Sequence, residues 1–159
     1  MPARRSHHES GLQTTLLSDT ERSVLEHRAQ GRTKAETAAA LGIAESTVSG
    51  HVSRAAGKLV TSGAPATLNA AYRTGQITLP DAVTGMEFSD DERRLWQEAA
   101  TRNTNIEIAR ALKLDPGQVG SALRDLMRRT GARDRVHLVM LAYAHRILHP
   151  DFGSGSGAA

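Results

Sequence analysis

The chain has 159 residues, a formal net charge of +3, 39% hydrophobic residues, 3% aromatic residues and no cysteine. The lack of cysteine excludes a disulfide framework and a thiolate metal site, and no apolar run reaches the roughly 20 residues that a membrane span needs. The core must be built from Leu, Val, Ile and Ala, so we expect an all-α, cytoplasmic protein without a cofactor.

Charge is unevenly distributed along the chain. Residues 87–98 hold five acidic side chains against two arginines, whereas residues 124–135 hold five arginines against two aspartates. The second segment is suited to phosphates, although a solvated face of mixed charge is also consistent with this pattern. Residues 1–14 have basic residues but no apolar segment behind them, so we predict a disordered basic arm and not a secretory signal.

The first predicted helix begins at a capping box. Ser18 and Glu21 have the Ser-x-x-Glu spacing, in which the serine hydroxyl accepts from the N–H three residues on and the glutamate accepts from the serine N–H. Val24, Leu25 and Ala29 then recur at helical spacing. These residues predict a helix with one buried face.

Three more helices are predicted before residue 76. Thr33 and Glu36 form a second capping box, and Gly42 fits the left-handed position that ends a helix. Apolar residues at helical spacing then predict helices at Glu45–Leu59 and Pro65–Thr74. The short separation of the second and third helices is typical of a helix-turn-helix.

The same signals return after residues 76–87, which lack helical periodicity and predict a linker. Capping boxes recur at Ser89 with Glu92 and at Thr104 with Glu107. Two further helices are predicted, from Pro116 to about Arg129 and from Asp134 to about His149. Residues 150–159 are predicted to be a flexible tail.

The signals repeat because the chain is similar to itself at an offset of 71 residues, the separation of Glu21 from Glu92. Residues 17–77 share thirteen identities with residues 88–148, where chance gives about four or five. Two pairs of capping boxes coincide at this offset. We therefore predict a duplication of a four-helix unit.

Residues 17–77 also fit one family pattern. The residues that carry it are Leu17, Ser18, Glu21, Val24, Leu25, Ala29, Gly31, Lys34, Ala38, Leu41, Ile43, Ala44, Thr47, Val48, His51, Lys58 and Leu59. With these residues the segment resembles the LuxR-type (GerE- or NarL-type) DNA-binding domain along its whole length. Residues 88–148 are a degenerate copy, because Gln118 and Ala122 stand where the family has Thr and His.

The resemblance implies a bacterial transcription regulator built from tandem helix-turn-helix modules, at residues 15–75 and 88–149, that binds double-stranded DNA. Family members use the positions of Ser49, Gly50 and Ser53 for base edges and those of Arg54 and Lys58 for phosphates. Carried over to both copies, the predicted DNA-binding residues are Lys34, Ser46, Thr47, Ser49, Gly50, Ser53, Arg54, Lys58, Asn105, Gln118, Gly120, Ser121, Arg124, Arg128 and Arg129.

Two interpretations of the third helix stay open at this point. Ser49 and Gly50 are short where long donors would read base edges, so the helix either approaches DNA closely or packs against a protein such as RNA polymerase or another regulator. Arg124, Arg128 and Arg129 are either phosphate clamps or ordinary surface residues.

Assembly is open as well. Family members dimerise through the fourth helix, so two modules either form a pseudo-dimer within one chain or pair with a second chain as a homodimer. The short N-terminal arm predicts that a sensor domain is absent or supplied by another protein.

The remaining candidates are weaker. His145 and His149 have a spacing that a metal can use on a helix, but no further ligands accompany them, so we predict surface histidines. Tyr72 and Tyr143, at matched positions of the repeat, are expected to pack between the first and fourth helices. No catalytic motif is present, so an enzyme is not expected.

Overall fold

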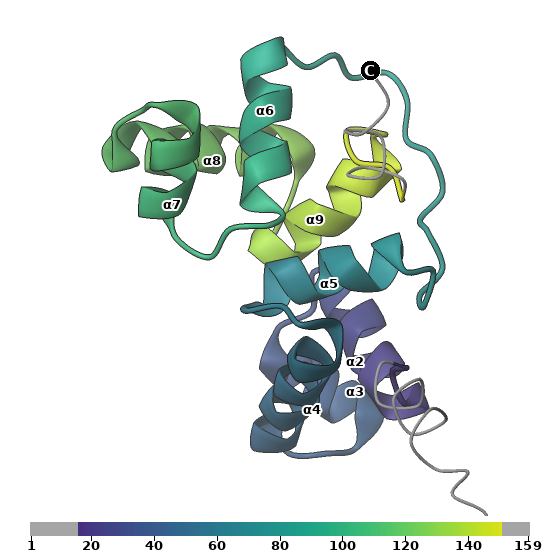
Figure 1. The fold of residues 1–159 in the computed structure, drawn as a ribbon. Coiled ribbons are helices and arrows are strands. Elements are labelled where there is room, and N and C mark those ends of the chain that lie inside the picture. The colour runs from purple at the N-terminus through teal and green to yellow at the C-terminus, as the bar shows by residue number, and fades with distance from the viewer. Residues whose placement is uncertain (1–15, 151–159) are drawn as a thin grey trace, which may run out of the picture.

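A computed structural model describes residues 16–150; the predicted arm at residues 1–14 and the tail from residue 151 lie outside the described residues. In this range the chain is all-α without a strand, and no helix is long and apolar enough to cross a membrane. The helices, labelled as in Figure 1, are α2 (Asp19–Ala29), α3 (Lys34–Leu41), α4 (Glu45–Leu59), α5 (Ala64–Arg73), α6 (Asp90–Ala99), α7 (Asn105–Leu112), α8 (Pro116–Thr130) and α9 (Arg135–Ala144).

Side-chain caps start most of these helices where they were predicted. Ser18, Ser89 and Thr104 each accept a hydrogen bond from the backbone N–H three residues on. The glutamate carboxylate accepts in return from the N–H of the capping residue and completes each capping box. At Thr33 only half of the predicted box forms. The Glu36 carboxylate accepts instead from the Thr33 hydroxyl at 3.3 Å and from Arg133 at 2.8 and 3.1 Å.

Helix ends also recur at the offset of 71 residues. The residue that ends α3 and the one that ends α7, Gly42 and Lys113, are both left-handed, with φ of 66° and 58°. Val60 and Gly131 end α4 and α8 in the same way, with φ of 55° and 76°. The backbone turns alike in both halves even where only one of the paired positions is glycine.

The last helix is shorter than predicted. The expected span from Asp134 to about His149 is wrong, because α9 ends at Ala144 and Arg146 takes a left-handed φ of 59°. The chain then turns back, and the Ala142 carbonyl accepts from the backbone N–H of Ile147 at 2.8 Å. Asp134 is the N-cap and accepts from the His137 backbone at 2.8 Å.

Within each half of the chain, the first three helices pack on one another. In the first half these are α2, α3 and α4, and α5 packs on α4. In the second half they are α6, α7 and α8, and of these three α9 packs mostly on α6, besides its contacts with the first half. A small apolar cluster of Val24, Ala38 and Val48 lies within the first half. A larger core is continuous from α2 through α5 and α9 to α8, so buried side chains join the two halves.

Helices α5 and α9 lie side by side where the halves meet (Figure 1). The rings of Tyr72 and Tyr143 are 4.6 Å apart there, and the Tyr143 hydroxyl donates to Oδ1 of the buried Asn69 at 2.6 Å. The tyrosines therefore contact each other across the two halves. The expectation that each packs between the first and fourth helices of its own unit does not describe this contact.

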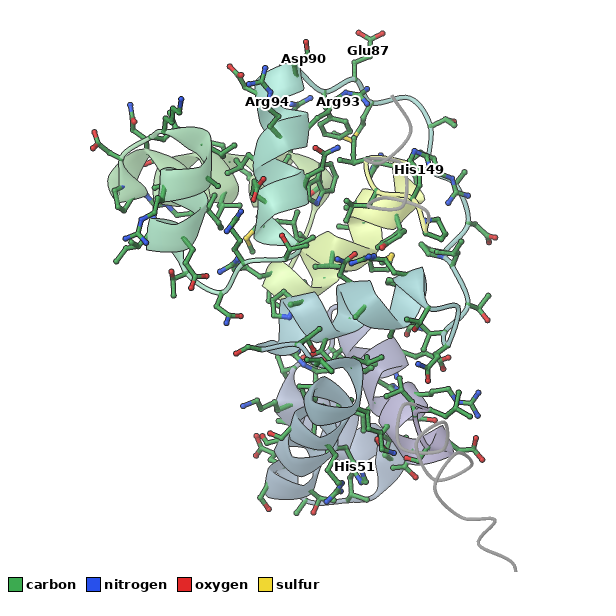
Figure 2. All side chains as sticks on the ribbon, in the orientation of Figure 1. His51, Glu87, Asp90, Arg93, Arg94 and His149 are labelled. Carbon is green, nitrogen blue, oxygen red and sulfur yellow. The ribbon has the colours of Figure 1, made fainter. Side chains whose placement is uncertain are left out.

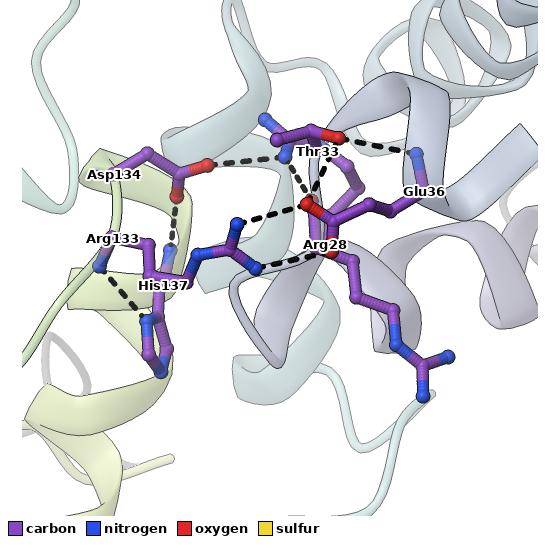
Figure 3. A network of polar contacts seen from close by, with 7 residues as sticks. Arg28, Thr33, Glu36, Arg133, Asp134 and His137 are labelled. Carbon is purple, nitrogen blue, oxygen red and sulfur yellow. Dashed lines mark hydrogen bonds and ion pairs between the residues drawn. The ribbon is translucent and has the colours of Figure 1, made fainter.

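A polar network closes the same interface at its edge. Figure 3 shows Arg133 reaching Glu36 and Arg28 reaching Asp134, the latter pair at 3.1 Å. The packing of the two halves is not symmetric within residues 16–150. Helix α9 packs on both α5 and α2, whereas α5 makes no comparable contact with α6. The halves therefore do not meet across a two-fold axis.

Candidate nucleic-acid interface

Helix α4 is positioned by its inward face and leaves its outer face open. Val48 and Ala55 are fully buried, and both belong to the apolar clusters that fix the helix against its neighbours. Ser46, Thr47 and Ser53 are exposed, together with Arg54. The predicted reader helix thus presents hydroxyls and one guanidinium to solvent over several turns.

Three of the predicted residues gather around one shallow hollow beside α4. Lys34, Ser49 and Ser53 line this hollow, which has a volume of about 270 Å³. Arg28 of α2 also lines it, although its guanidinium is bonded to Asp134 at 3.1 Å. An ammonium beside two hydroxyls can donate to phosphate oxygens or to base edges, so the hollow has the donors that DNA needs.

Arg28 is a residue that the sequence did not single out. The matched position in the second half holds Ala99, so the repeat gave no signal for a cation there. Its side chain is 12% exposed and contacts a carboxylate from the other half of the chain. That contact is long-range, so the sequence alone did not indicate it.

The structure gives Lys58 a partner other than phosphate. Its ammonium donates to Oε1 of the buried Glu21 at 2.5 Å, linking α4 to α2. Burial acts to raise the pKa of Glu21, but the hydrogen bonds from Lys58 and Ser18 outweigh it, so this pKa is lowered. The predicted phosphate contact of Lys58 would compete with this ion pair.

Gly50 and His51 complete the described surface of α4. Both are half-buried, and His51, labelled in Figure 2, lies 3.0 Å through Nδ1 from the Arg54 guanidinium. Because the imidazole holds Arg54 along the helix, His51 supports a predicted site residue without being part of the predicted set.

A second group of predicted residues lies together where the start of α7 meets α8, here called the α8 cluster: Asn105 of α7 with Gly120, Ser121 and Arg124 of α8. A Cβ atom on Gly120 would lie 3.5 Å from the Asn105 amide nitrogen and 3.7 Å from an Arg124 nitrogen. The Arg124 guanidinium donates to the Ser121 hydroxyl at 3.2 Å. The cluster brings amide, hydroxyl and guanidinium donors from α7 and α8 to one patch.

The other predicted residues of the second half differ in their availability. Arg128 is 79% exposed and reaches Asp125 only at 3.5 Å, so its guanidinium remains available to a phosphate. Gln118 caps α8, because its carbonyl oxygen accepts from the Asp115 backbone at 3.0 Å. Arg129 is bonded to the Glu92 carboxylate and lies 5.1 Å from the centre of the Phe88 ring.

The pairs Lys58 with Glu21 and Arg129 with Glu92 occupy matched positions of the repeat. In both halves the cation near the end of the third helix holds the glutamate that starts the first helix. The pKa of Glu92 is lowered by the backbone N–H of Ser89 and by Arg129, against the effect of burial. Both cations therefore have a structural role that the sequence comparison did not predict.

The histidine pair does not form a metal site. His145 follows the end of α9, and its ring lies 5.3 Å from Phe88 and 5.8 Å from Trp96. His149, labelled in Figure 2, is exposed and lies beyond the helix, so the two side chains do not share a helical face. Residues 16–150 contain no group of His, Asp and Glu able to hold a metal ion.

Comparison with known protein families gives a match over residues 15–68, to the bacterial regulatory proteins of the LuxR family, also called GerE. The matched residues include α2, α3 and α4 with the first half of α5. Neither the curated proteins nor the solved structures gave a match. A LuxR-type helix-turn-helix domain suggests a DNA-binding transcription regulator, and the family is one of regulators and not of enzymes.

Proposed function

We propose that the chain is a bacterial transcription regulator that binds a bipartite operator with two helix-turn-helix modules, using α4 and α8 as its two reader helices. The observation that carries the proposal is the open outer face of α4 inside the matched family domain. The repeat of caps, helix ends and glutamate ion pairs at one offset supports a second module of the same plan.

The two reader helices are proposed to make different contributions to DNA binding. On α4 the side chains of Ser49 and Ser53 are short. This helix therefore recognises DNA through close approach and groove shape more than through bidentate hydrogen bonds to base edges. On α8 the exposed Arg124 and Arg128 supply the salt-dependent attraction to phosphates. Lys34 and Asn105 stand at matched positions beside their readers and are proposed to bind the DNA backbone.

The contact between α5 and α9 supports an internal pseudo-dimer over a homodimer. These helices are the ones through which family members are expected to dimerise, and here they cover each other with Tyr72, Tyr143 and Asn69 buried between them. Because the halves are not related by a two-fold axis, the half-sites are not expected to be palindromic. We propose a single chain on two unlike half-sites.

Selection from random-sequence duplexes at physiological salt, followed by sequencing, tests this proposal. We expect recovery of one shared motif in two parts, with centres separated by about one helical turn, roughly 10 base pairs. The variant Ser53→Glu, which places a carboxylate on the outer face of α4, is expected to lose one part of the motif. The variant Ser62→Glu adds the same charge at an exposed position beyond α4 and serves as the control.

Recovery of no motif would contradict the proposal. If the chain instead bound RNA polymerase or another regulator with no preference among duplexes, α4 would be a protein-binding face.

A further inference from the structure

The second half has an apolar pocket that DNA binding does not use. It lies between α6, α7 and α8 and has a volume of about 350 Å³. Its apolar wall is formed by Leu95, Leu112, Leu114, Ala122 and Leu126. Two of these, Leu95 and Leu126, belong to the main core, whereas Leu114 is 44% exposed at the mouth. The pocket is thus an opening from solvent into the core.

The two halves differ at one wall of the pocket. Ala122 stands at the position matched by His51, which is half-buried in the first half, so the second copy has a methyl group where the first has an imidazole. Leu41 and Ile43, matched by Leu112 and Leu114, pack against the small cluster of the first half. Ala122 is therefore the smaller side chain of the matched pair, and it forms part of the pocket wall.

The rim of the pocket is acidic. Asp91, Glu92 and Asp125 line it together with a single cation, Arg94. Asp91 has no ion-pair partner within residues 16–150, and the pair of Asp125 with Arg128 is long, at 3.5 Å, with both side chains at least 70% exposed. Exposed pairs of this kind are weak, so at least two carboxylates remain available to a ligand.

We propose that this pocket binds a small organic cation, an aromatic or branched aliphatic amine whose apolar part contacts the leucines and whose ammonium meets Asp91 and Asp125. Ligand pockets of about 300 Å³ or more accept molecules of this size, and a few polar groups at the rim fix their orientation. A charged donor facing a carboxylate beside an apolar wall gives a stronger bond than a neutral donor. The site does not depend on α8 reading DNA.

Titration of the full chain with 2-phenylethylamine, without DNA, tests the site by ¹H–¹⁵N NMR. We expect saturable shifts at Leu95, Leu112 and Leu126, and roughly tenfold weaker binding of 2-phenylethanol, which has the same ring but no charge. The anion phenylacetate is expected not to bind. Asp91→Asn should abolish the preference for the amine over the alcohol, and Arg94→Gln, which removes the like charge, should strengthen amine binding.

Filling the pocket is the second arm of the test. Ala122→Phe is expected to abolish amine binding, and Ala122→His, which restores the residue of the first half, to weaken it. Ala111→Phe places the same ring on an exposed position of α7 outside the pocket wall and should leave amine binding unchanged. The helical circular dichroism spectrum of each variant is the folding control.

Three results would overturn the proposal: no saturable shifts, equal binding of phenylacetate and the amine, or amine binding that survives Ala122→Phe in a folded chain. None of these results depends on DNA binding, so a failure here is distinguishable from a failure of the proposed regulator function.

Discussion

At the scale of single residues, two buried threonines differ in how their hydroxyls are satisfied. Thr37 in α3 is fully buried and its hydroxyl has no hydrogen-bond partner among residues 16–150, while the matched position in the second half is Ile108. Thr67 in α5 is also fully buried, but its hydroxyl bonds to Thr61 and to the Gly63 carbonyl, both at 2.8 Å. A buried hydroxyl is costly only when it lacks a partner.

Replacing each threonine with valine should therefore change stability in opposite directions. Thr37→Val is expected to raise the free energy of unfolding by about 1 kcal/mol, because it removes an unsatisfied group at nearly constant volume. Thr67→Val is expected to lower it by about 1 kcal/mol, because it leaves the Thr61 hydroxyl without its buried partner. Urea denaturation measures both. A loss of stability in Thr37→Val would show that its hydroxyl has a partner after all.

The ion pair of Lys58 with Glu21 predicts a pH dependence. The pKa of Glu21 in the folded chain lies below its ordinary value of 4.5, so the ionised carboxylate stabilises the fold above that pH and the contribution is lost as pH falls through the lowered pKa. Lys58→Met should lower the free energy of unfolding at pH 7 by about 2 kcal/mol, because it leaves a buried carboxylate without its cation.

The difference between Lys58→Met and the unaltered chain should shrink below pH 4.5, where Glu21 becomes protonated. Arg129→Met is the matched control, because its partner Glu92 is 28% exposed and the expected loss is smaller, about 1 kcal/mol or less. A difference that stayed constant between pH 7 and pH 3 would contradict this role for Lys58.

The sequence predicted residue roles well where the partner is local. Ser18, Ser89 and Thr104 cap their helices because hydroxyl and N–H are three residues apart. It missed the role of Lys58, because Glu21 is 37 residues away along the chain. Glu36 was predicted to complete a cap, but a guanidinium from the other half attracts it more strongly than the neutral backbone does.

At the scale of elements, periodicity located the helices and failed at one end. A helix from Glu45 to about Leu59 was predicted and α4 has these bounds, because Val48 and Ala55 keep a helical spacing to the core. The end of α9 was missed because the left-handed turn falls at Arg146, which carries no glycine signal. The matched residue Gly75 is also left-handed, so the repeat itself indicates a helix end at the position of Arg146.

The proposed phosphate role of α8 gives a prediction at this scale. Arg124→Ala and Arg128→Ala are each expected to weaken DNA binding and to reduce the slope of log K against log salt by about 1, because each removes one phosphate contact. Arg22→Ala removes the same charge from the exposed side of α2 and should leave the slope unchanged. Fluorescence anisotropy at several salt concentrations measures the slope. Equal slopes for all variants would show that Arg124 and Arg128 are ordinary surface residues that do not bind phosphate.

At the scale of the whole molecule, the packing of the halves was not predictable from the sequence. The repeat indicates two similar units, but similar units can pair within one chain or between chains. The choice depends on long-range contacts, including Tyr143 with Asn69, which are 74 residues apart. The continuous core makes the pair of halves one structural unit, so we expect them to unfold together.

The Tyr143 hydroxyl tests this interface. Tyr143→Phe should lower the free energy of unfolding by about 1 to 2 kcal/mol, because the buried Asn69 carbonyl loses its donor. Tyr72→Phe is the matched control, since its ring packs against Tyr143 but its hydroxyl makes no hydrogen bond within residues 16–150. Thermal unfolding followed at Trp96 and by helical circular dichroism should give one transition for both variants. Two separate transitions in the unaltered chain would show that the halves are independent.

The most direct test of the proposed function is a hydroxyl-radical footprint of the chain on a duplex recovered by selection. With α4 and α8 on one duplex, we expect two protected segments about one helical turn apart and one chain per duplex. Ser53→Glu should remove protection of one segment, and the double variant Arg124→Glu with Arg128→Glu should remove protection of the other. A single protected segment that the changes on α8 leave intact would contradict two readers in one chain.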